Sequence, residues 1–358
     1  MRILIATDAW HPQVNGVVRT LTMMAEAAAR LGADISFLNP QSFATVALPS
    51  YPDLRVAIPG PARIARLIAQ ARPDNIHIAT EGPIGILVRR FCLKHRLPFT
   101  TSFHTRFPEY IAARSPIPES WVWAGLRRFH APSHAVMAAT PALADELRKR
   151  GFGNVVLWPR GVDANLFQPR SFDLALPRPV FLSVGRIAVE KNLEAFLALE
   201  LPGTKLIVGD GPDRAALARK YSDAVFLGAM QGEQLAEVYA SADVFVFPSR
   251  TDTFGLVLLE ALASGLPVAA FPVCGPRDVI GDAPVGVLSE DLRSACLAAL
   301  DLSPEACRVF ALTQTWEACA RAFIDNVARA RTDAQRVAEP GLLPVASRTV
   351  AWIRNIVA

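Results

Sequence analysis

The chain has 358 residues and 51% hydrophobic residues, which is more than one ordinary domain requires and enough for two cores. Its five cysteines show no paired C-x-x-C spacing, which argues against a disulfide framework and a zinc site. The net charge of +4 conceals an asymmetry, because residues 1–168 carry 19 basic and 11 acidic groups and the remainder carries 18 and 22. The basic half favours an anionic partner, either phospholipid headgroups or nucleic acid.

The beginning of the chain does not read as a signal peptide, because Met1-Arg2 is followed by a short strand-like run that meets Asp8 almost at once. The longest apolar stretch contains Glu260 and Pro267 and falls short of about 20 clean residues, so no membrane span is predicted. We therefore expect a cytosolic protein.

Short aliphatic runs alternate with amphipathic segments along the chain. The expected strands are "RILIA", "DISFLN", "NIHIAT" and "PFTTSFH" in the first half, then "PVFLSVG", "KLIVGDG", "AVFLG", "DVFVFPS" and "LPVAAF". Alternation of this kind is typical of parallel sheets with helices on both faces, and such sheets bind ligands beyond the carboxyl ends of their strands. The fold class predicted is α/β, with two doubly wound Rossmann-like domains facing each other across a cleft.

The segment 158–179 is rich in proline and turn residues and lacks any period, so the domain linker is placed there. The predicted division is 1–168 for an N-terminal acceptor-binding domain and 169–325 for a C-terminal nucleotide-sugar-binding domain. A tail or helix over 326–358 is expected to return to the N-terminal domain. Apolar residues at helical spacing after Ser347 fit a terminal helix packed on the protein or one lying on a membrane surface.

A helix with one buried acid follows a strand in "FVFPSRTDTFGLVLLEALASG". Its first turn, near Gly255, presents unpaired backbone N–H groups that suit a diphosphate, and glycine lets the backbone approach closely. Glu260 lies more than one turn further in, where a carboxylate needs hydrogen-bond donors. Sugar hydroxyls would supply them, and so would a buried arginine in a purely structural role.

This stretch is similar to the D/E-x7-E motif of retaining glycosyltransferases of family four, which have the GT-B fold. The resemblance implies that Asp252 contacts the donor sugar and Glu260 the ribose of the nucleotide. Most relatives carry Glu at the first position, so the carboxylate of Asp252 is one methylene shorter. The residues around them that we expect to bind the donor are Thr253, Phe254, Gly255 and Leu256.

Two further segments of the second half resemble the same family. In "SVGRIAVEKNLEAFL" the residues Gly185, Arg186 and Lys191 match the segment that neutralises the donor diphosphate, and a planar Arg fork with a compact Lys charge suits two phosphates. Taken alone, the two cations would fit a solvated face better than a phosphate site. The loop near Met230 corresponds to the one that runs beside the nucleobase.

The first half matches the family in two places. In "DAWHPQVNGVVRTL" the position of Gly16 faces the diphosphate and the acceptor, with Asn15 where many relatives have a second glycine. In "TTSFHTRFPEY" His104 matches a histidine that contacts the donor sugar, and Tyr110 is expected at the cleft edge. The resemblance covers residues 1–327 and is strongest to the branch that glycosylates lipids, including sulfoquinovosyl- and glycosyl-diacylglycerol synthases and related mannosyltransferases.

The resemblance implies a metal-independent hexosyltransferase that retains anomeric configuration, with no cofactor. No D-x-D sequence is present to hold a metal, and His104, Arg186, Lys191 and Asp252 are the expected catalytic residues. The expected donor is a UDP-sugar and the expected acceptor a lipid such as diacylglycerol. A mannosyltransferase that uses GDP-mannose, with a lipid or oligosaccharide acceptor, and an inactive sugar-nucleotide-binding protein remain as alternatives.

The segment "ARSPIPESWVWAGLRRFH" places aromatic residues beside cations, a combination that suits a bilayer interface. Trp121, Trp123, Arg127 and Arg128 are expected on the acceptor and membrane side, although core tryptophans with surface arginines would give the same pattern. The protein is therefore expected to be peripheral on the inner face of the cell membrane. A nicotinamide oxidoreductase is disfavoured because no G-x-G-x-x-G follows a strand, and a nucleic-acid partner because no aromatic-basic stacking surface appears.

Overall fold

The computed structural model describes residues 1–13, 15–48, 51–104 and 117–337, and it divides the chain into two compact units. The first unit contains Met1–Pro159 and the chain from Glu317 onward, and the second contains Arg160–Trp316. Both divisions fall earlier than the predicted boundaries at 168/169 and 325/326. Tyr110 and the chain beyond residue 337 lie outside the described residues.

Packing explains why the second unit begins at Arg160. The guanidinium of Arg308, on helix α13 (Pro304–Leu312), donates to the carbonyl oxygens of Ala164 and Phe167 at 2.8 and 2.7 Å. Val162 forms a parallel bridge with Thr315. Residues that composition assigns to a linker are therefore fixed to the second unit.

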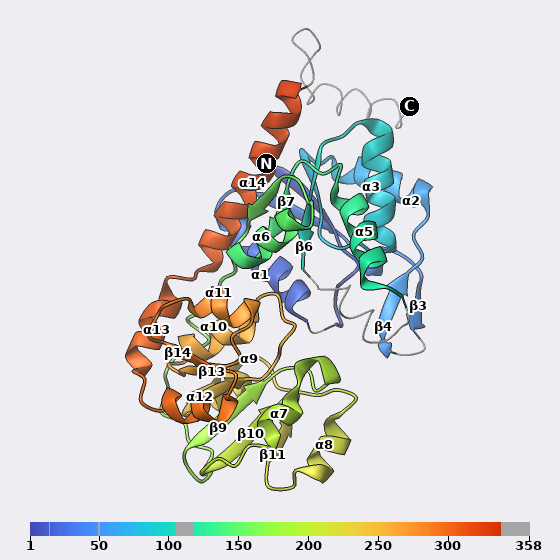
Figure 1. The fold of residues 1–358 in the computed structure, drawn as a ribbon. Coiled ribbons are helices and arrows are strands. Elements are labelled where there is room, and N and C mark those ends of the chain that lie inside the picture. The colour runs from blue at the N-terminus through green and yellow to red at the C-terminus, as the bar shows by residue number, and fades with distance from the viewer. Residues whose placement is uncertain (14, 49–50, 105–116, 338–358) are drawn as a thin grey trace. The chain divides into compact units, whose positions relative to one another are not determined.

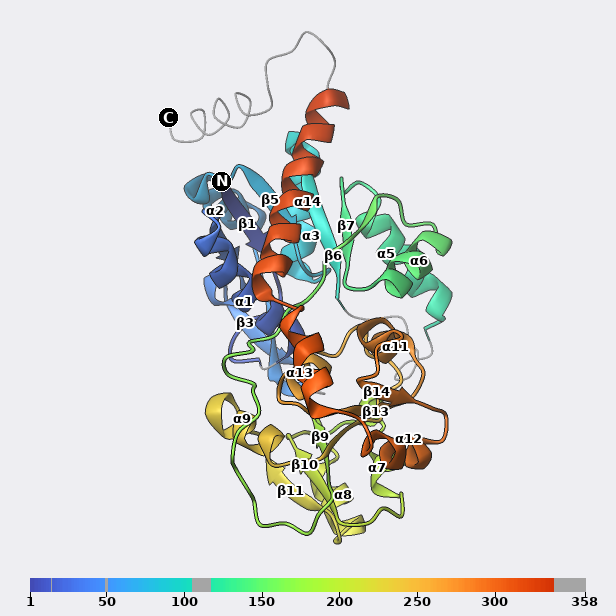
Figure 2. The same cartoon turned by 90° about the vertical axis from the view of Figure 1, so that its left-hand side faces the viewer.

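The long helix α14 (Trp316–Val337) belongs to the first unit for most of its length (Figures 1 and 2). Its Phe323 is fully buried, with ring centroids 5.0 Å from both His77 and Trp158. Asn326 adds a hydrogen bond from Nδ2 to the carbonyl of Leu157 at 2.8 Å. A single continuous helix thus starts at the unit boundary, ahead of the tail predicted from residue 326.

The first unit has a six-stranded parallel sheet in the order β2-β1-β5-β6-β7-β8. Its strands are β1 (Arg2–Ala6), β2 (Asp34–Leu38), β5 (Asn75–Ile78), β6 (Phe99–Phe103), β7 (Val136–Ala138) and β8 (Val155–Leu157). The helices are α1 (Gly16–Arg30), α2 (Pro61–Ala71), α3 (Pro83–His95), α5 (Glu119–His130) and α6 (Pro141–Lys149), with a short turn η1 (Pro40–Ser42). An antiparallel hairpin, β3 (Thr45–Leu48) and β4 (Tyr51–Ala57), is inserted before α2.

The second unit has a parallel sheet in the order β11-β10-β9-β12-β13-β14. Its strands are β9 (Val180–Val184), β10 (Thr204–Val208), β11 (Val225–Gly228), β12 (Val244–Phe247), β13 (Val268–Ala270) and β14 (Gly286–Leu288). The remaining elements are η2 (Val189–Lys191), α7 (Leu193–Leu197), α8 (Arg214–Lys220), α9 (Gly232–Ala240), α10 (Leu256–Ala263), α11 (Cys274–Ile280) and α12 (Leu292–Ala299), followed by α13. The predicted α/β class, with two parallel doubly wound halves, is confirmed.

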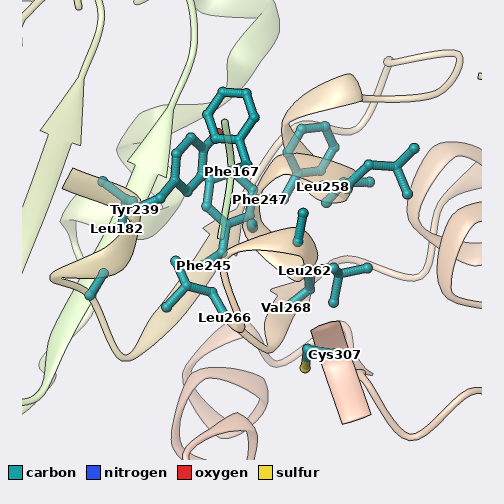
Figure 3. Packing of buried hydrophobic residues seen from close by; sticks show 14 of the residues in the cluster. Phe167, Leu182, Tyr239, Phe245, Phe247, Leu258, Leu262, Leu266, Val268 and Cys307 are labelled. Atoms are coloured by element: carbon teal, nitrogen blue, oxygen red, sulfur yellow. The ribbon is translucent and has the colours of Figure 1, made fainter. Parts of the chain in front are cut away.

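One face of the second sheet is covered by aromatic and leucine side chains (Figure 3). Phe245 is fully buried, with Tyr239 of α9 at a ring-centroid distance of 5.8 Å. Leu258 and Leu262 of α10 are fully buried in the same cluster. This apolar contact fixes α10, and with it the loop that precedes it, against the carboxyl end of β12.

Candidate functional site

The strand order of the second unit defines where a ligand would bind. Strands β10 and β11 are added on one side of β9, and strands β12, β13 and β14 on the other. Strands β9 and β12 are therefore parallel neighbours although two strands lie between them in sequence. Parallel sheets of this kind bind ligands beyond the carboxyl ends of the two strands at such a switch point. The loop after β9 carries Arg186 and Lys191, and the loop after β12 carries Asp252, so topology brings these three residues to the same edge.

Lys191 and Asp252 meet directly, with Nζ 2.6 Å from Oδ1. Asn192 donates from Nδ2 to the carbonyl of Pro248 at 3.1 Å, so two contacts join the loops. The pair is half-buried, with side chains 28% and 17% exposed, so water screens it only partly. The other oxygen of Asp252, Oδ2, is buried and accepts no hydrogen bond within the described part of the chain. A hydroxyl group of a ligand would satisfy it.

Two glycines let neighbouring loops stack without side chains between them. A Cβ on Gly209 would lie 1.8 Å from the carbonyl oxygen of Gly185, and one on Gly211 would lie 2.2 Å from that of Ile187. Both glycines have positive φ. Arg186, which follows Gly185, is exposed at this edge. The loop after β9 is therefore held by backbone packing while its arginine faces solvent.

Helix α10 begins at this edge with Gly255 as its N-cap, at φ +87°, a conformation that favours glycine. Glycine offers no capping side chain, so the first amides of the helix keep the capacity to bind an anion. Thr253, Phe254 and Leu256 are half-buried around it. Met230, in the loop after β11, is half-buried too and packs against the apolar core.

Glu260 is only 3% exposed and lies among the apolar side chains of the second unit. Its Oε2 accepts a hydrogen bond at 3.1 Å from the hydroxyl of Tyr239, which is fully buried. A buried carboxylate requires donors of this kind. The tyrosine is a partner that the sequence analysis did not identify.

The first amides of α1 are not open to an anion in the way that those of α10 are. The side-chain oxygen of Asn15 accepts from the amides of Val17 and Val18, both at 3.0 Å. Asn15 is therefore the N-cap of this helix, and its oxygen occupies the two amides that would otherwise be open to a ligand. Gly16, the first helical residue, is exposed.

A second switch point lies between β1 and β5 of the first unit. Asp8 follows β1, and its carboxylate accepts from the amides of Ile84 and Gly85 at 2.8 and 3.3 Å and from the hydroxyl of Thr80 at 2.9 Å. Burial raises the pKa of Asp8, and these hydrogen bonds lower it in part. Asp8 thus anchors the start of α3 and is a polar residue of this edge that the sequence analysis missed.

His104 follows β6 and is half-buried. Its Nε2 lies 2.8 Å from Oγ of Ser102, and its ring centroid is 5.6 Å from that of Trp158. It lies in the first unit, whereas Arg186, Lys191 and Asp252 lie in the second. The hydrogen-bond partner Ser102 was not singled out from the sequence.

The residues expected on the membrane side do not share one environment. Trp121 is 73% exposed, whereas Trp123 is 6% exposed and stacks on Phe103 with ring centroids 5.8 Å apart. The prediction for Trp123 as a membrane-facing residue was wrong, because it packs in the core of the first unit. Arg127 and Arg128 are exposed, and Arg127 donates to the carbonyl of Arg150 at 3.0 Å.

Two further properties bear on the site. No described helix is long and apolar enough to cross a membrane. Across the described ranges, no group of three or more His, Cys, Asp or Glu side chains is arranged to hold a metal ion.

These features define a class: two parallel doubly wound halves, each with polar loops at its switch point, as in the GT-B fold of glycosyltransferases. The model of glycosyltransferase family 4 matches residues 14–166, and that of the group 1 glycosyl transferases matches residues 178–302. The chain belongs to glycosyltransferase family 4.

The chain is similar to a GDP-mannose-dependent alpha-mannosyltransferase of Mycobacterium tuberculosis, with 31% identity over 80% of this chain and 83% of that protein. It is 28% identical to the alpha-monoglucosyldiacylglycerol synthase of Streptococcus pneumoniae over 85% of this chain and 79% of the synthase. Among solved structures, the sucrose-phosphate synthase of Thermosynechococcus elongatus superposes with a TM-score of 0.75 at 20% identity, covering 93% and 99% of the two chains. The last comparison concerns the fold alone.

Proposed function

We propose that this transferase moves a sugar from a nucleotide-sugar donor, preferentially a UDP-sugar, to a lipid acceptor such as diacylglycerol. The observation that carries the donor half is the meeting of Lys191 and Asp252 at the switch point of the second unit. A cation beside a carboxylate that has an unsatisfied oxygen suits a ligand with a phosphate next to sugar hydroxyls. When the donor binds, contacts of Lys191 with the diphosphate and of Asp252 with the sugar would replace the Lys191–Asp252 contact.

Catalysis is proposed to proceed without a metal. Arg186, Lys191 and the amides at the start of α10 would stabilise the charge that builds on the diphosphate as the glycosidic bond breaks. The acceptor hydroxyl attacks the anomeric carbon of the sugar from the same face that the diphosphate leaves. The departing phosphate oxygen takes the proton of that hydroxyl, so the anomeric configuration is retained. Detection by mass spectrometry of a covalent sugar–enzyme adduct would contradict this front-face mechanism.

The lipid acceptor is supported by two observations. The similar protein from Streptococcus pneumoniae is named as a synthase of a glycosylated diacylglycerol. On this chain, Trp121 is 73% exposed on α5, whose last turn carries Arg127 and Arg128. Aromatic and cationic residues together favour a bilayer interface, so we propose peripheral attachment to an anionic membrane surface.

The second candidate is transfer of mannose from GDP-mannose, which the similarity to the mycobacterial mannosyltransferase favours. Radiolabelled UDP-sugars and GDP-mannose, each incubated with the protein and a membrane lipid extract, would decide between the two. The proposal expects label from a UDP-sugar in the organic phase. Label from GDP-mannose alone would select the second candidate, and no label in any product would indicate an inactive sugar-nucleotide-binding protein.

A further inference from the structure

The outward face of helix α3 carries cations and large apolar residues together. Ile86, Arg90 and Leu93 have the spacing of one helix face, and all three are exposed, Ile86 at 39% and Leu93 at 44%. Lys94 is exposed beside them. Because the outer face of a surface helix is normally polar, the two aliphatic side chains mark α3 as a candidate contact surface.

Arg89 joins α3 to its neighbour α5. Its Nε donates to the carbonyl of Phe129 at 2.7 Å, and its Nη2 donates to the carbonyl of Arg128 at 2.9 Å, so the two helices lie side by side (Figure 1). On α5, Trp121 and Arg128 are exposed and seven residues apart, which places them on the same side of that helix. We call the combined outer face the α3–α5 surface, and it consists of Ile86, Arg90, Leu93, Lys94, Trp121 and Arg128.

The helices around this surface contain few acids. Helices α2, α3 and α5 have two, three and two Lys or Arg residues, and their one acidic residue is Glu119. Glu119 accepts a hydrogen bond at 2.9 Å from the indole N–H of Trp123. In the part of the chain that the structure describes, neither Arg90 nor Lys94 forms an ion pair. The positive charge of the surface is therefore not neutralised by the helices that carry it.

The arginines at the junction of α3 and α5 are close enough to repel one another. Burial lowers the pKa of Arg89, and the nearby charges of Arg128 and Arg90 lower it further. Helix α8 of the second unit also has cations and no acid, but its Arg214 and Lys220 pair with acids outside the helix. The α3–α5 surface thus lacks the anions that accompany cations on α8, and an anionic partner would supply them.

An anionic bilayer fits the α3–α5 surface better than a nucleic acid does. Phosphate groups of either partner would neutralise the cations, but only a bilayer offers an apolar layer beneath its phosphates for Ile86, Leu93 and Trp121. Ile86 lies in the first turn of α3, which Asp8 anchors at the carboxyl edge of the first sheet through the amide of Ile84 at 2.8 Å. A bilayer on this surface would therefore extend to the edge of the sheet where parallel folds bind their ligands.

We propose that the α3–α5 surface is the membrane-binding face of the protein and that α3 contributes to it as α5 does. Arg90, Lys94 and Arg128 bind lipid phosphates, and the three exposed apolar residues enter the headgroup region. The inference rests on the proposed membrane attachment, to which it adds α3. It also explains why the positive charge of the first half of the chain is concentrated on helices that lack acids.

The test is co-sedimentation of the full-length protein with vesicles at low salt. One set contains equal amounts of phosphatidylcholine and phosphatidylglycerol, and the other contains phosphatidylcholine alone. Each cation near an anionic surface contributes about fivefold to partitioning, so Arg90→Gln/Lys94→Gln should lower binding to the anionic vesicles by about tenfold or more. The matched control is Arg219→Gln/Lys220→Gln on α8, which removes the same charge from an exposed site and should bind as the unmodified protein does. An equal loss in the control would overturn the proposal, because net charge alone would then explain binding.

Leu93→Gln tests the apolar contribution without a change of charge. It should lower binding to the anionic vesicles several-fold, and an unchanged partition coefficient would contradict insertion of α3. Thermal melting by circular dichroism should give the same Tm for all variants, since the substituted side chains are exposed. A duplex oligonucleotide that binds the unmodified protein but not Arg90→Gln/Lys94→Gln, without matching loss on vesicles, would assign the surface to nucleic acid instead.

Two outcomes separate this inference from the attachment on which it rests. Equal binding of the unmodified protein to both sets of vesicles would remove the membrane attachment and the inference with it. Binding that is lost in Trp121→Ala/Arg128→Gln but retained in Arg90→Gln/Lys94→Gln would overturn the role of α3 alone, and attachment through α5 would stand.

Discussion

The hydrogen bond between Tyr239 and Glu260 gives the most direct test of how the second unit holds its buried acid. Tyr239→Phe removes one oxygen and leaves the ring, which packs against Phe167 and Phe245 at centroid distances of 5.5 and 5.8 Å. The change therefore isolates the hydroxyl that donates to Glu260 at 3.1 Å. No cavity of consequence is created.

The expected cost follows from burial. Tyr239 is fully buried and Glu260 is 3% exposed, so water cannot replace the lost donor. A hydrogen bond to a charged group contributes about 1.5–3 kcal/mol, so the free energy of unfolding should fall by this amount. Glu260→Gln retains an acceptor oxygen but removes the charge, and the effect of Tyr239→Phe should be smaller in that background.

Urea denaturation followed by circular dichroism gives the four free energies of the double-mutant cycle. The expected coupling energy is about 1 kcal/mol or more, in the range found for contacting residues. A cost of Tyr239→Phe below about 0.5 kcal/mol, or a coupling energy of zero, would show that the hydroxyl is not an important donor to Glu260.

Three other predictions concern the first unit, the junction and the membrane. Burial raises the pKa of Asp8, so between its ordinary and raised values the folded state binds more protons than the unfolded state, and the free energy of unfolding should fall as pH rises through that window. In urea denaturation, Asp8→Asn should lack this decrease with pH. The same pH dependence in the variant and the unmodified protein would contradict the assignment. A Cβ on Gly161 would lie 2.3 Å from a backbone nitrogen, so Gly161→Ala should cost about 1–3 kcal/mol and lower the Tm, whereas Gly153→Ala, with open space around it, should not. Vesicles rich in anionic lipid should bind the protein at low salt and bind a Trp121→Ala/Arg128→Gln variant several-fold less; equal recovery with neutral vesicles would refute the membrane proposal.

The strands that sequence predicts correctly are those with enough apolar residues to show a pattern. Runs such as Val180–Val184 and Val244–Phe247 are buried on both faces and read as continuous hydrophobic segments. Strands β7, β8 and β14 have three residues each and were missed, because their pairing depends on neighbours elsewhere in the chain. Strand β13 is equally short, but it was predicted from the longer apolar run "LPVAAF". The β3–β4 hairpin was missed as well.

The sequence could place the site residues that lie on recognisable motifs, but it could not identify their hydrogen-bond partners. Tyr239 reaches Glu260 from another helix, and His77 reaches Ser102 across a strand pair, so both contacts depend on tertiary packing and register. Trp123 is different, because the sequence contains the information needed to place it. Residues two apart on a helix lie on nearly opposite sides, so Trp121 and Trp123 could not both face a membrane.

The central claim is that cationic side chains at the switch point of the second unit hold the donor diphosphate without a metal. The most direct measurement is the initial rate of transfer in EDTA for the unmodified protein and for Arg186→Ala/Lys191→Met, with Arg186→Ala alone to separate the effect of breaking the Lys191–Asp252 contact. The exposed pair Arg219→Ala/Lys220→Met on α8 provides a control with the same change of charge.

Loss of two charge-assisted contacts at about 1.5–3 kcal/mol each should lower kcat/KM of the double variant by about a thousandfold. The unmodified protein and the control should keep their rates in EDTA. An unchanged rate in the double variant, or loss of activity of the unmodified protein in EDTA, would contradict the account.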